Sequence, residues 1–343
     1  MRKIYLFLTL VITVFAACDK TEHETTDQYQ YLNAAEEREN VTEAERAEYA
    51  SYAWRRERRN EAGLPKNFRT CLSEFVECDP HNGYDPDYVP SREGMDELMI
   101  SASSDFSDMQ LDSVVAEIRK IHSGPITIVD LRKEFHGLLN GNHVSRYGKH
   151  NWENIGLSRE TIVAAESDLF HSSVGQQIVT YTLNSSNNYE PNDPDTLLVT
   201  SAKTEEEQCA ERGLGYYRLT VLDHCFTDPR SLDDFIAFAC SLPQDTWLHF
   251  HCQAGKGRTT MYMVFYDFLR NTDVSEKDVV YRQYKIGGNF MYYQGDDPDE
   301  DPFKVELSKE KAEMVPLVYR YIQENHAQGF PVTWTQWKQQ FNN

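Results

Sequence analysis

The chain lacks a hydrophobic run long enough to cross a membrane as a helix. The longest apolar stretch near the N-terminus extends from Ile4 to Ala17, whereas a comfortable membrane span needs about 20 residues. Arg2 and Lys3 precede this stretch, and basic residues followed by a short apolar segment are typical of a secretory signal. Residues 1–17 are therefore predicted to be a signal peptide.

The residues that end this apolar stretch indicate what becomes of the signal. Phe15-Ala-Ala-Cys18 resembles a bacterial lipoprotein cleavage box, with Phe15 in place of the usual aliphatic residue. The resemblance implies cleavage before Cys18 and attachment of lipid to that cysteine. The alternative is an ordinary signal peptide in which Cys18 has no role. We expect an exported, membrane-anchored lipoprotein, periplasmic or on the cell surface.

Cysteine is also scarce. The chain has seven cysteines in 343 residues, and the six after Cys18 are too widely spread for a disulfide scaffold. They are Cys71, Cys78, Cys209, Cys225, Cys240 and Cys252. Cys71 and Cys78, seven residues apart, are the pair that an oxidising compartment could join.

Positive charge is in short supply. Lys and Arg number 34 against 55 Asp and Glu, which gives a formal net charge of −21. Nonspecific nucleic-acid binding is therefore not expected, because it depends on neutralising phosphates with Lys and Arg. A polyanionic ligand would have to be held by a local concentration of basic side chains.

The most informative stretch of the sequence has a cysteine and an arginine separated by five residues, Cys252 and Arg258. It lies between an apolar run predicted as a strand at 247–251 and a second, predicted as a buried helix at 259–269. A loop that closes onto a helix N-terminus directs successive backbone N–H groups at one point, and the helix dipole adds positive charge there. The predicted phosphate-binding loop is Gln253, Ala254, Gly255, Lys256 and Gly257.

This arrangement suits a phosphatase that uses a cysteine nucleophile. Arg258 can offer a bidentate fork to two phosphate oxygens, and the positive field of the loop favours the thiolate form of Cys252. A Cys-x5-Arg spacing also occurs by chance, with Cys252 as an ordinary buried cysteine. The apolar strand before it, the apolar helix after it and Thr259 next to the arginine argue against chance.

The pattern around the loop predicts an α/β fold. Strands are expected at 126–131 and 216–222 and helices at 108–121, 275–284 and 309–324, with Asp228-Pro229 starting another helix. Strands that alternate with helices indicate a central sheet flanked by helices. Between 137 and 206, short runs punctuated by glycine predict an inserted, mainly β lobe that contains one helix at 159–169. The core is assigned to 64–136 and 207–343, and 18–63 to a charged tether and a surface helix. The charged cluster 54–59 is expected on a face of that helix rather than in a binding patch.

The loop His251-Cys-Gln-Ala-Gly-Lys-Gly-Arg-Thr259 resembles the signature of protein-tyrosine-phosphatase-like enzymes. More narrowly, the chain resembles the cysteine phytases of anaerobic bacteria, which are myo-inositol polyphosphate phosphatases. The likeness extends over most of 64–340 and includes the segments 64–70, 89–95, 129–132, 136–137, 222–224, 281–283, 286–288 and 319–325. It implies a phosphatase core with a small β lobe and a polyanionic inositol phosphate as substrate.

The reaction needs a proton donor for the poor alkoxide leaving group. Asp223 follows a predicted strand and precedes a loop and helix, and the resemblance points to the same residue. Asp228 is the competitor, although a helix-capping role accounts for it. The catalytic residues are thus predicted to be Cys252, Asp223 and Arg258.

Basic side chains outside the loop are expected to bind the remaining phosphates of the substrate. The resemblance implies Arg69 and Lys311 as contacts, and Lys304 and Lys309 lie near Lys311 in sequence and could contribute. His224, next to Asp223, either contacts a substrate phosphate or orients the acid. Two features depart from the family pattern. Asn151 precedes Trp152 where the related enzymes have Asp, and the lobe loop 184–195 contains no Lys or Arg.

Two other classes of function stay open from the sequence. The same chemistry could act on phosphotyrosine or phosphoinositides, or the protein could bind inositol phosphates at the surface without turnover. His249 and His251 share one face of a strand, but no third ligand is apparent nearby in sequence, so we expect no metal and no other cofactor. His251 is expected to brace the loop by hydrogen bonding.

Overall fold

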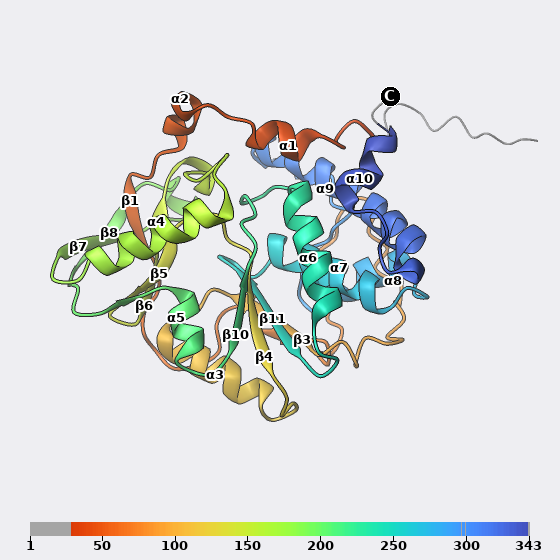
Figure 1. The fold of residues 1–343 in the computed structure, drawn as a ribbon, viewed down its shortest axis with the longest axis horizontal. Helices are drawn as coiled ribbons and strands as arrows, with labels where there is room; N and C mark the ends of the chain where they lie inside the picture. The colour runs from red at the N-terminus through yellow and green to blue at the C-terminus, as the bar shows by residue number, and fades with distance from the viewer. Residues whose placement is uncertain (1–28, 296, 299, 342–343) are drawn as a thin grey trace, which may run out of the picture.

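The structure, a computed structural model, describes residues 29–295, 297–298 and 300–341. The predicted signal peptide and Cys18 lie outside the described residues. The fold contains two sheets, one at the centre of the molecule and one in a lobe at its side (Figure 1). Within the described part of the chain, none of the helices combines the length and the apolar character that crossing a bilayer requires.

The central sheet has the strand order β10-β4-β11-β3-β2. β10, β4, β11 and β3 run parallel, and β2 pairs antiparallel with β3. Sheets of this kind are covered on both faces, and every residue of β3 and β11 is buried. The strands are β2 Arg69–Thr70, β3 Ile100–Ser104, β4 Ile126–Asp130, β10 Gly215–Arg218 and β11 Trp247–Cys252.

Helices cover this sheet, as the alternating pattern predicted. α7 (Gly257–Arg270) is buried from Arg258 to Leu269, which confirms the prediction of a central buried helix. Asp228 caps α6 and accepts a hydrogen bond from the Ser231 amide. The helices of the core are α3 Asp108–Ile118, α6 Pro229–Ser241, α7, α8 Glu276–Lys285, α9 Pro302–Asn325 and α10 Trp334–Lys338.

The second sheet forms the predicted β-rich lobe. Its strand order is β8-β7-β1-β6-β5-β9, and α4 (Arg159–Ser172) packs beside it. The strands are β1 Ala53–Arg58, β5 His136–Leu139, β6 Asn142–Tyr147, β7 Gln177–Thr182, β8 Asn192–Leu198 and β9 Ala202–Lys203. α5 (Glu205–Ala210) then leads back to the core.

The prediction for residues 54–59 was wrong. They were expected on a charged helix face, but Ala53–Arg58 forms β1 and pairs with both β6 and β7. Alternate residues of β1 are buried, so Arg55 and Glu57 point inward and form an ion pair at 2.5 Å. An inward-facing strand normally shows apolar residues at every second position, and a buried ion pair hides that signal. The lobe is therefore not a single insertion.

The compact fold also begins before residue 64, contrary to expectation. α1 (Ala34–Glu39) packs on the core, and Arg38 pairs with Glu310 of α9 at 2.5 Å. Leu32 and Ala35 are buried. A short polar segment gives little apolar periodicity, so its docking depended on contacts with helices almost 300 residues away.

Candidate active site

The Cys-x5-Arg loop lies at the carboxyl end of β11, in the interior of the central sheet. Neighbouring parallel strands β3 and β4 pair with β11 up to Cys252 and His251, respectively. The loop then enters α7 at Gly257. Ligands of open parallel sheets bind outside the carboxyl ends of the strands, so the topology places Cys252 where a substrate can reach it.

The loop is held in shape from outside through its carbonyl groups. The Asp105 amide donates to the Cys252 carbonyl at 2.8 Å, and Arg58 Nη2 donates to the Gln253 carbonyl at 3.3 Å. Asn67 Nδ2 binds the Ala254 carbonyl and Arg69 Nη1 binds the Gly255 carbonyl, both at 2.8 Å. Because these oxygens are occupied on the outside, the amides of the loop are left to face its interior. That is the requirement for an anion nest.

Gly255 is required by its surroundings as well as by its backbone. Its φ of 69° lies in the left-handed region, where a side chain is strained. A Cβ atom would also meet the backbone carbon of Ser103 at 2.2 Å. The loop can therefore approach β3 this closely only with glycine at this position.

Arg258 is buried, with 3% of its surface exposed, and points toward Cys252 and two carboxylates. Glu134 binds it in bidentate fashion, at 2.8 Å to Nη1 and 3.1 Å to Nη2. Asp223 Oδ1 lies 3.1 Å from Nη2. Although burial opposes ionisation, Arg258 and Arg132 hold the pKa of Glu134 well below its usual range. Glu134 therefore stays ionised, and its carboxylate orients the Arg258 guanidinium.

Asp223 reaches the same pocket from the loop after β10. Burial raises the pKa of its carboxyl, but Arg258 and His224 outweigh burial and lower the pKa to about 2. Asn151 Nδ2 donates to Oδ2 at 2.8 Å and the Trp152 indole donates to the backbone carbonyl at 3.0 Å. Asp228 instead caps α6, as the sequence indicated, so of the two candidate acids it is Asp223 that shares the pocket with the nucleophile.

These groups line a pocket of about 410 Å³. Its walls carry the nucleophile, loop residues, cations and aromatic rings. The lining residues include Cys252, Arg258, Asp223, His224, Asn151, Arg55, Lys256, Lys304, Lys311, Tyr147, Tyr189, Phe290 and Met291. The structure thus brings together Cys252, Asp223, Arg258, His224, Lys304 and Lys311, as predicted.

Arg69 is the exception among the predicted substrate contacts. It is 3% exposed and lies beneath the loop, where it binds the Gly255 carbonyl and Thr260 Oγ1. It lies outside the set of described residues that line the pocket. Arg69 therefore braces the loop, and the expectation of direct substrate contact was wrong. Its placement follows from β2 pairing with β3, which turns the side chain inward.

Arg55 of β1 was missed as a pocket residue. Its guanidinium lies 4.8 Å above the Tyr147 ring and pairs with Glu57. The signal was present in the basic cluster 55–59, but its pairing partners are about 90 and 125 residues away in the lobe sheet. The roles of Asn67 and Arg58 in holding the loop, and of Glu134 in orienting Arg258, were missed because their partners are also distant in sequence.

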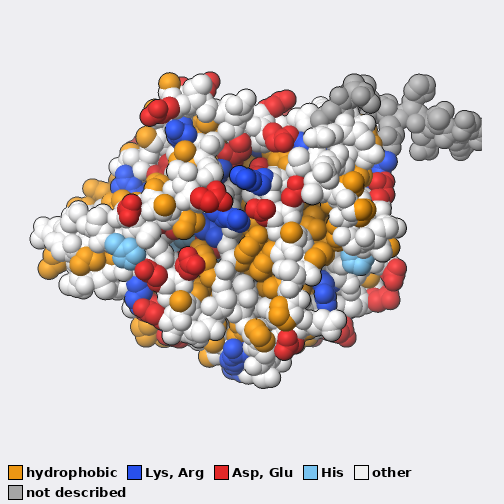
Figure 2. Space-filling view, in the orientation of Figure 1, with side chains coloured by type: hydrophobic (Ala, Val, Ile, Leu, Met, Phe, Trp, Pro, Cys, Tyr) orange, Lys and Arg blue, Asp and Glu red, His pale blue; other side chains and the backbone are white. Residues whose placement is uncertain are grey.

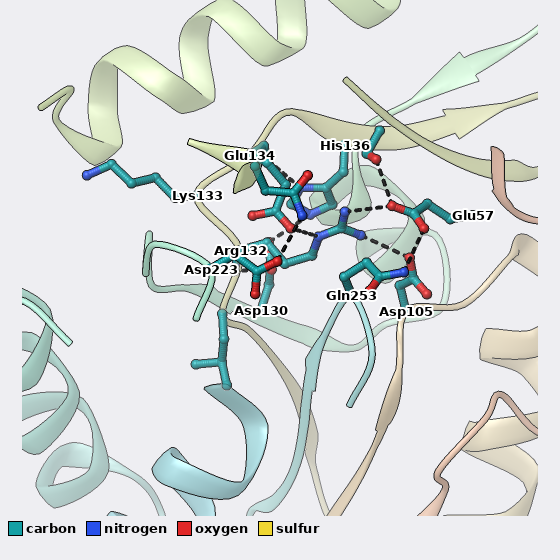
Figure 3. A network of polar contacts seen from close by, with 12 residues as sticks. Glu57, Asp105, Asp130, Arg132, Lys133, Glu134, His136, Asp223 and Gln253 are labelled. Carbon is teal, nitrogen blue, oxygen red and sulfur yellow. Dashed lines mark hydrogen bonds and ion pairs between the residues drawn. The ribbon is translucent and has the colours of Figure 1, made fainter. Parts of the chain in front are cut away.

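Behind the loop, buried charges join the lobe to the core. Figure 3 shows Arg132 between Glu57, Asp105 and Glu134, with ion pairs of 3.2, 3.0 and 2.8 Å. Gln253 of the loop also reaches Glu57 at 3.0 Å. Further along the interface, Glu205 Oε2 lies 3.1 Å from His251 Nε2, and Glu205 Oε1 lies 3.1 Å from His143 Nε2.

Carboxylates thus lie beside His251, contrary to the expectation that nothing near it could complete a metal site. Two groups have ligand atoms close enough for an ion, His136 with His143 and Glu205, and Asp130 with Glu205 and His251. However, His136 Nδ1 contacts the Glu134 carbonyl at 2.8 Å and Nε2 contacts Asp130 at 3.0 Å. Both ring nitrogens face acceptors, so both carry hydrogen. Although burial opposes the charge, Asp130 raises the pKa of His136 to about 10. The imidazolium therefore already neutralises this cluster.

A second pocket, of about 380 Å³, lies between the first turns of α4 and α6, on the face that Figure 2 shows. Basic and acidic side chains are interspersed there. Lys133 pairs with Glu39 at 2.7 Å and Arg159 with Asp234 at 3.4 Å. Its positive charge is compensated by carboxylates of the protein itself.

Known proteins resemble this chain in sequence and in fold. A family model for protein-tyrosine-phosphatase-like phytases, described as inositol hexakisphosphate, matches residues 129–270. The tandemly repeated phytase of this type from Mitsuokella multacida is 38% identical, with a TM-score of 0.79. The alignment covers 84% of this chain and 49% of that one, and a further structure of the Mitsuokella myo-inositol phosphatase, with the same values, is a complex with myo-inositol-(1,3,4,5)-tetrakisphosphate.

Two other relatives extend the comparison. The protein-tyrosine-phosphatase-like phytase from Bdellovibrio bacteriovorus is 29% identical, with a TM-score of 0.66 and coverage of 85% of this chain and 96% of that one. The effector protein HopD2 of Pseudomonas syringae pv. tomato is 26% identical over 234 residues, covering 66% of this chain and 49% of HopD2. The chain thus spans about half the length of the Mitsuokella and Pseudomonas proteins.

The central sheet with a Cys-x5-Arg loop at the end of its interior strand β11, faced by an aspartate, defines the protein-tyrosine-phosphatase-like class. Within that class, the six-stranded lobe, the family match and the structural neighbours point to the phytases. The chain is thus similar to the protein-tyrosine-phosphatase-like phytases in sequence and in fold, as the sequence resemblance implied.

Proposed function

We propose that this protein hydrolyses phosphate monoesters of myo-inositol polyphosphates through a cysteinyl-phosphate intermediate. The observation that carries the proposal is the convergence of Cys252, Arg258 and Asp223 on one pocket that also receives Lys304 and Lys311. Lys304 lies on the first turn of α9 and Lys311 two turns further on. Their charges can engage phosphates other than the one being transferred.

In the first step the Cys252 thiolate attacks phosphorus, and the bond from phosphorus to the inositol oxygen breaks. Protonated Asp223 gives its proton to the departing alkoxide. Arg258 and the loop amides bind the equatorial oxygens, where negative charge is held in the transition state. The products are the free hydroxyl of the inositol and phosphate bonded to Cys252.

In the second step the Asp223 carboxylate accepts a proton from water. The oxygen of that water bonds to phosphorus, the S–P bond breaks, and Cys252 leaves as the thiolate. Inorganic phosphate is released and Asp223 is again protonated for the next turnover. The residues that act here do not require a metal, so turnover should survive treatment with a chelator.

The ion pair between Asp223 and Arg258 has a consequence for the first step. In the free protein Arg258 favours the carboxylate form of Asp223, which cannot donate a proton. A substrate phosphate bound to Arg258 compensates that positive charge and brings negative charge toward Asp223, and both changes raise its pKa. Binding of the dianion therefore prepares its own proton donor.

Replacement of the nucleophile tests this proposal. Cys252→Ser should abolish phosphate release from inositol hexakisphosphate while thermal unfolding stays close to that of the wild type. Cys240→Ser is the matched control and should keep full activity, because Cys240 is exposed and lies outside the set of described residues that line the pocket. Turnover that persists in Cys252→Ser would exclude the mechanism. Binding without turnover in the wild type would favour the non-catalytic alternative.

One observation favours a second substrate class, phosphotyrosine. Tyr147 and Tyr189 stack at 5.4 Å with an interplanar angle of 11° on the pocket wall, and an aromatic ester could pack against them. Turnover of a phosphotyrosine peptide, an inositol lipid and inositol hexakisphosphate should be compared. Lys304→Ala should raise KM for the hexakisphosphate and leave KM for the peptide unchanged if inositol polyphosphates are the substrate.

The N-terminal sequence supports a further proposal, that the protein is exported and anchored to a membrane by lipid on Cys18. The basic residues, the apolar stretch and the position of Cys18 support it. In a bacterial host, wild-type protein should incorporate labelled fatty acid and sediment with membranes, and Cys18→Ala should do neither. Export of an unlabelled, soluble wild-type protein would instead support an ordinary signal peptide.

A further inference from the structure

The lobe holds the general acid through one short segment, His150–Trp152, between β6 and α4. Two hydrogen bonds connect this segment to Asp223. Asn151 Nδ2 donates to carboxylate Oδ2 at 2.8 Å, and the Trp152 indole donates to the Asp223 carbonyl at 3.0 Å. One bond fixes the backbone of the acid and the other fixes its carboxylate.

The backbone of this segment is unusual. His150 and Asn151 have φ values of 59° and 62°, so two consecutive residues adopt the left-handed conformation. Non-glycine residues pay for this conformation, and Asn tolerates it better than most. Strain of this kind persists where the surrounding structure enforces it, often at functional sites. Here Trp152 is 4% exposed and contacts Tyr49 and Phe303, which anchors the segment.

The Asn151 side chain is itself buried, with 5% of its surface exposed, and belongs to the pocket wall. Its amide nitrogen binds Asp223, while its Oδ1 has no hydrogen-bond partner among the described residues. A buried amide oxygen without a partner is costly. Asn151 is therefore held where it donates to Asp223 and leaves an acceptor at the edge of the substrate pocket.

We propose that Asn151 is a positioning residue that orients the Asp223 carboxylate toward the leaving group and sets its proton affinity. The inference rests on the proposed function, because this role matters when the substrate is an alkyl phosphate, whose alkoxide leaving group must be protonated. An N–H donor stabilises the ionised carboxylate, so Asn151 keeps Asp223 acidic and confines proton donation to lower pH.

Other titratable groups also lie close enough to act on Asp223. They are Arg258 of α7, Lys311 of α9, Glu134 of the segment after β4, Tyr147 of β6, and His224 of the same loop as Asp223. Substitution of Asn151 leaves all of these in place. A change in pH dependence after substitution would therefore report the contact between Asn151 and Asp223.

Asn151→Asp is the sharpest test, because it keeps the shape and tolerates the left-handed backbone. It replaces a donor with a second carboxylate 2.8 Å from Asp223, and two carboxylates at that distance share a proton. The alkaline limb of kcat/KM should move up by about one pH unit or more. Asn192→Asp is the charge-matched control in the same lobe, since Asn192 is exposed and Asp can retain its Oδ1 bond to the Asp193 amide. It should leave the limb unchanged.

Asn151→Gly removes the amide while suiting the same backbone. It should lower kcat at least about tenfold on glycerol 2-phosphate, an alkyl ester, because general acid catalysis contributes about 10²–10⁴-fold. On p-nitrophenyl phosphate, whose leaving group needs no proton, the loss should be small. A merely structural role would lower both rates equally.

Failure of the role of Asn151 and failure of the proposed substrate would give different results. An unmoved alkaline limb in Asn151→Asp, or equal losses on both esters in Asn151→Gly, would overturn the assignment of Asn151. A wild-type protein that cleaves glycerol 2-phosphate but not inositol hexakisphosphate would overturn the proposed substrate instead. In that case the comparison of Asn151 variants on glycerol 2-phosphate would still decide the present inference.

Discussion

The central sheet and the lobe interface are stabilised by different physical means. The strands β3, β4 and β11 lie in a core of apolar side chains such as Ile100, Ile128 and Phe250, each fully buried. At the interface with the lobe, Arg132, Glu134 and His136 are just as buried but carry charge. Apolar packing loses free energy gradually as atoms are removed, whereas a buried charge that loses its partner is left uncompensated.

The largest effect on stability should come from the centre of the charged network. Arg132→Met removes the guanidinium shared by Glu57, Asp105 and Glu134 and leaves these buried carboxylates with one cation fewer between them. The free energy of unfolding should fall by about 3–5 kcal/mol, measured by urea denaturation. A variant as stable as the wild type would show that the interface tolerates apolar replacement.

The next effect is the dependence of stability on pH. The pKa of His136 is about 10 in the folded protein, above about 6.5 for an unfolded histidine. A pKa raised by folding means that the folded state holds the proton more tightly. Its stabilisation is therefore fully present below pH about 6.5 and is lost as pH rises toward 10.

Urea denaturation at intervals from pH 6 to 10 should show this loss in the wild type. His136→Gln should be less stable at pH 6 and should show a flatter profile over the same range. Equal slopes in the two proteins would mean that His136 is not charged in the folded state.

A conservative change in the core should have a smaller effect. Ile128→Val removes one methylene group from a fully buried strand residue, and such changes cost about 0.5–1.5 kcal/mol. The same denaturation series would measure it. A loss as large as that of Arg132→Met would remove the distinction between the two regions.

The smallest effect should come from a charge on the outside of the lobe. Arg59 pairs with Asp195 at 3.0 Å, but the arginine side chain is 54% exposed. Arg59→Ala should change stability by less than about 1 kcal/mol, because solvent screens exposed pairs. The pair should also weaken in high salt, unlike the buried network. A large loss would indicate that Arg59 has a structural role beyond this pair.

The difference between the apolar core and the charged interface also separates the elements that the sequence predicted from those that it did not. The helices around Val114 and Phe235 and the strand at Ile128 were predicted because their apolar periodicity is local. β1 was predicted as a helix face because its buried positions, Arg55 and Glu57, are charged. Apolar periodicity cannot reveal a strand whose inward side chains neutralise one another.

In the candidate site, the features that the sequence revealed involve residues adjacent in the chain, and those that it missed involve residues far apart in the chain. The loop from Cys252 to Arg258 was recognised because its residues are adjacent in the chain. Asp223 was also found, but its ion pair with Arg258 and its bond to Asn151 were not, since these partners lie 35 and 72 residues away. Arg69 was assigned to the substrate because its sequence position says nothing about which way its side chain points.

The sequence by itself determined the nucleophile, the phosphate-binding arginine and the glycine that allows the loop to curl, because these requirements are local to seven residues. Tertiary structure decided the rest. It set the outward carbonyl contacts that turn the loop amides inward, the ionisation of Asp223, and the hold of the lobe on that acid through Asn151. Each of these depends on charges and hydrogen-bonding groups brought within about 3 Å from distant parts of the chain, where burial removes the water that would otherwise weaken them.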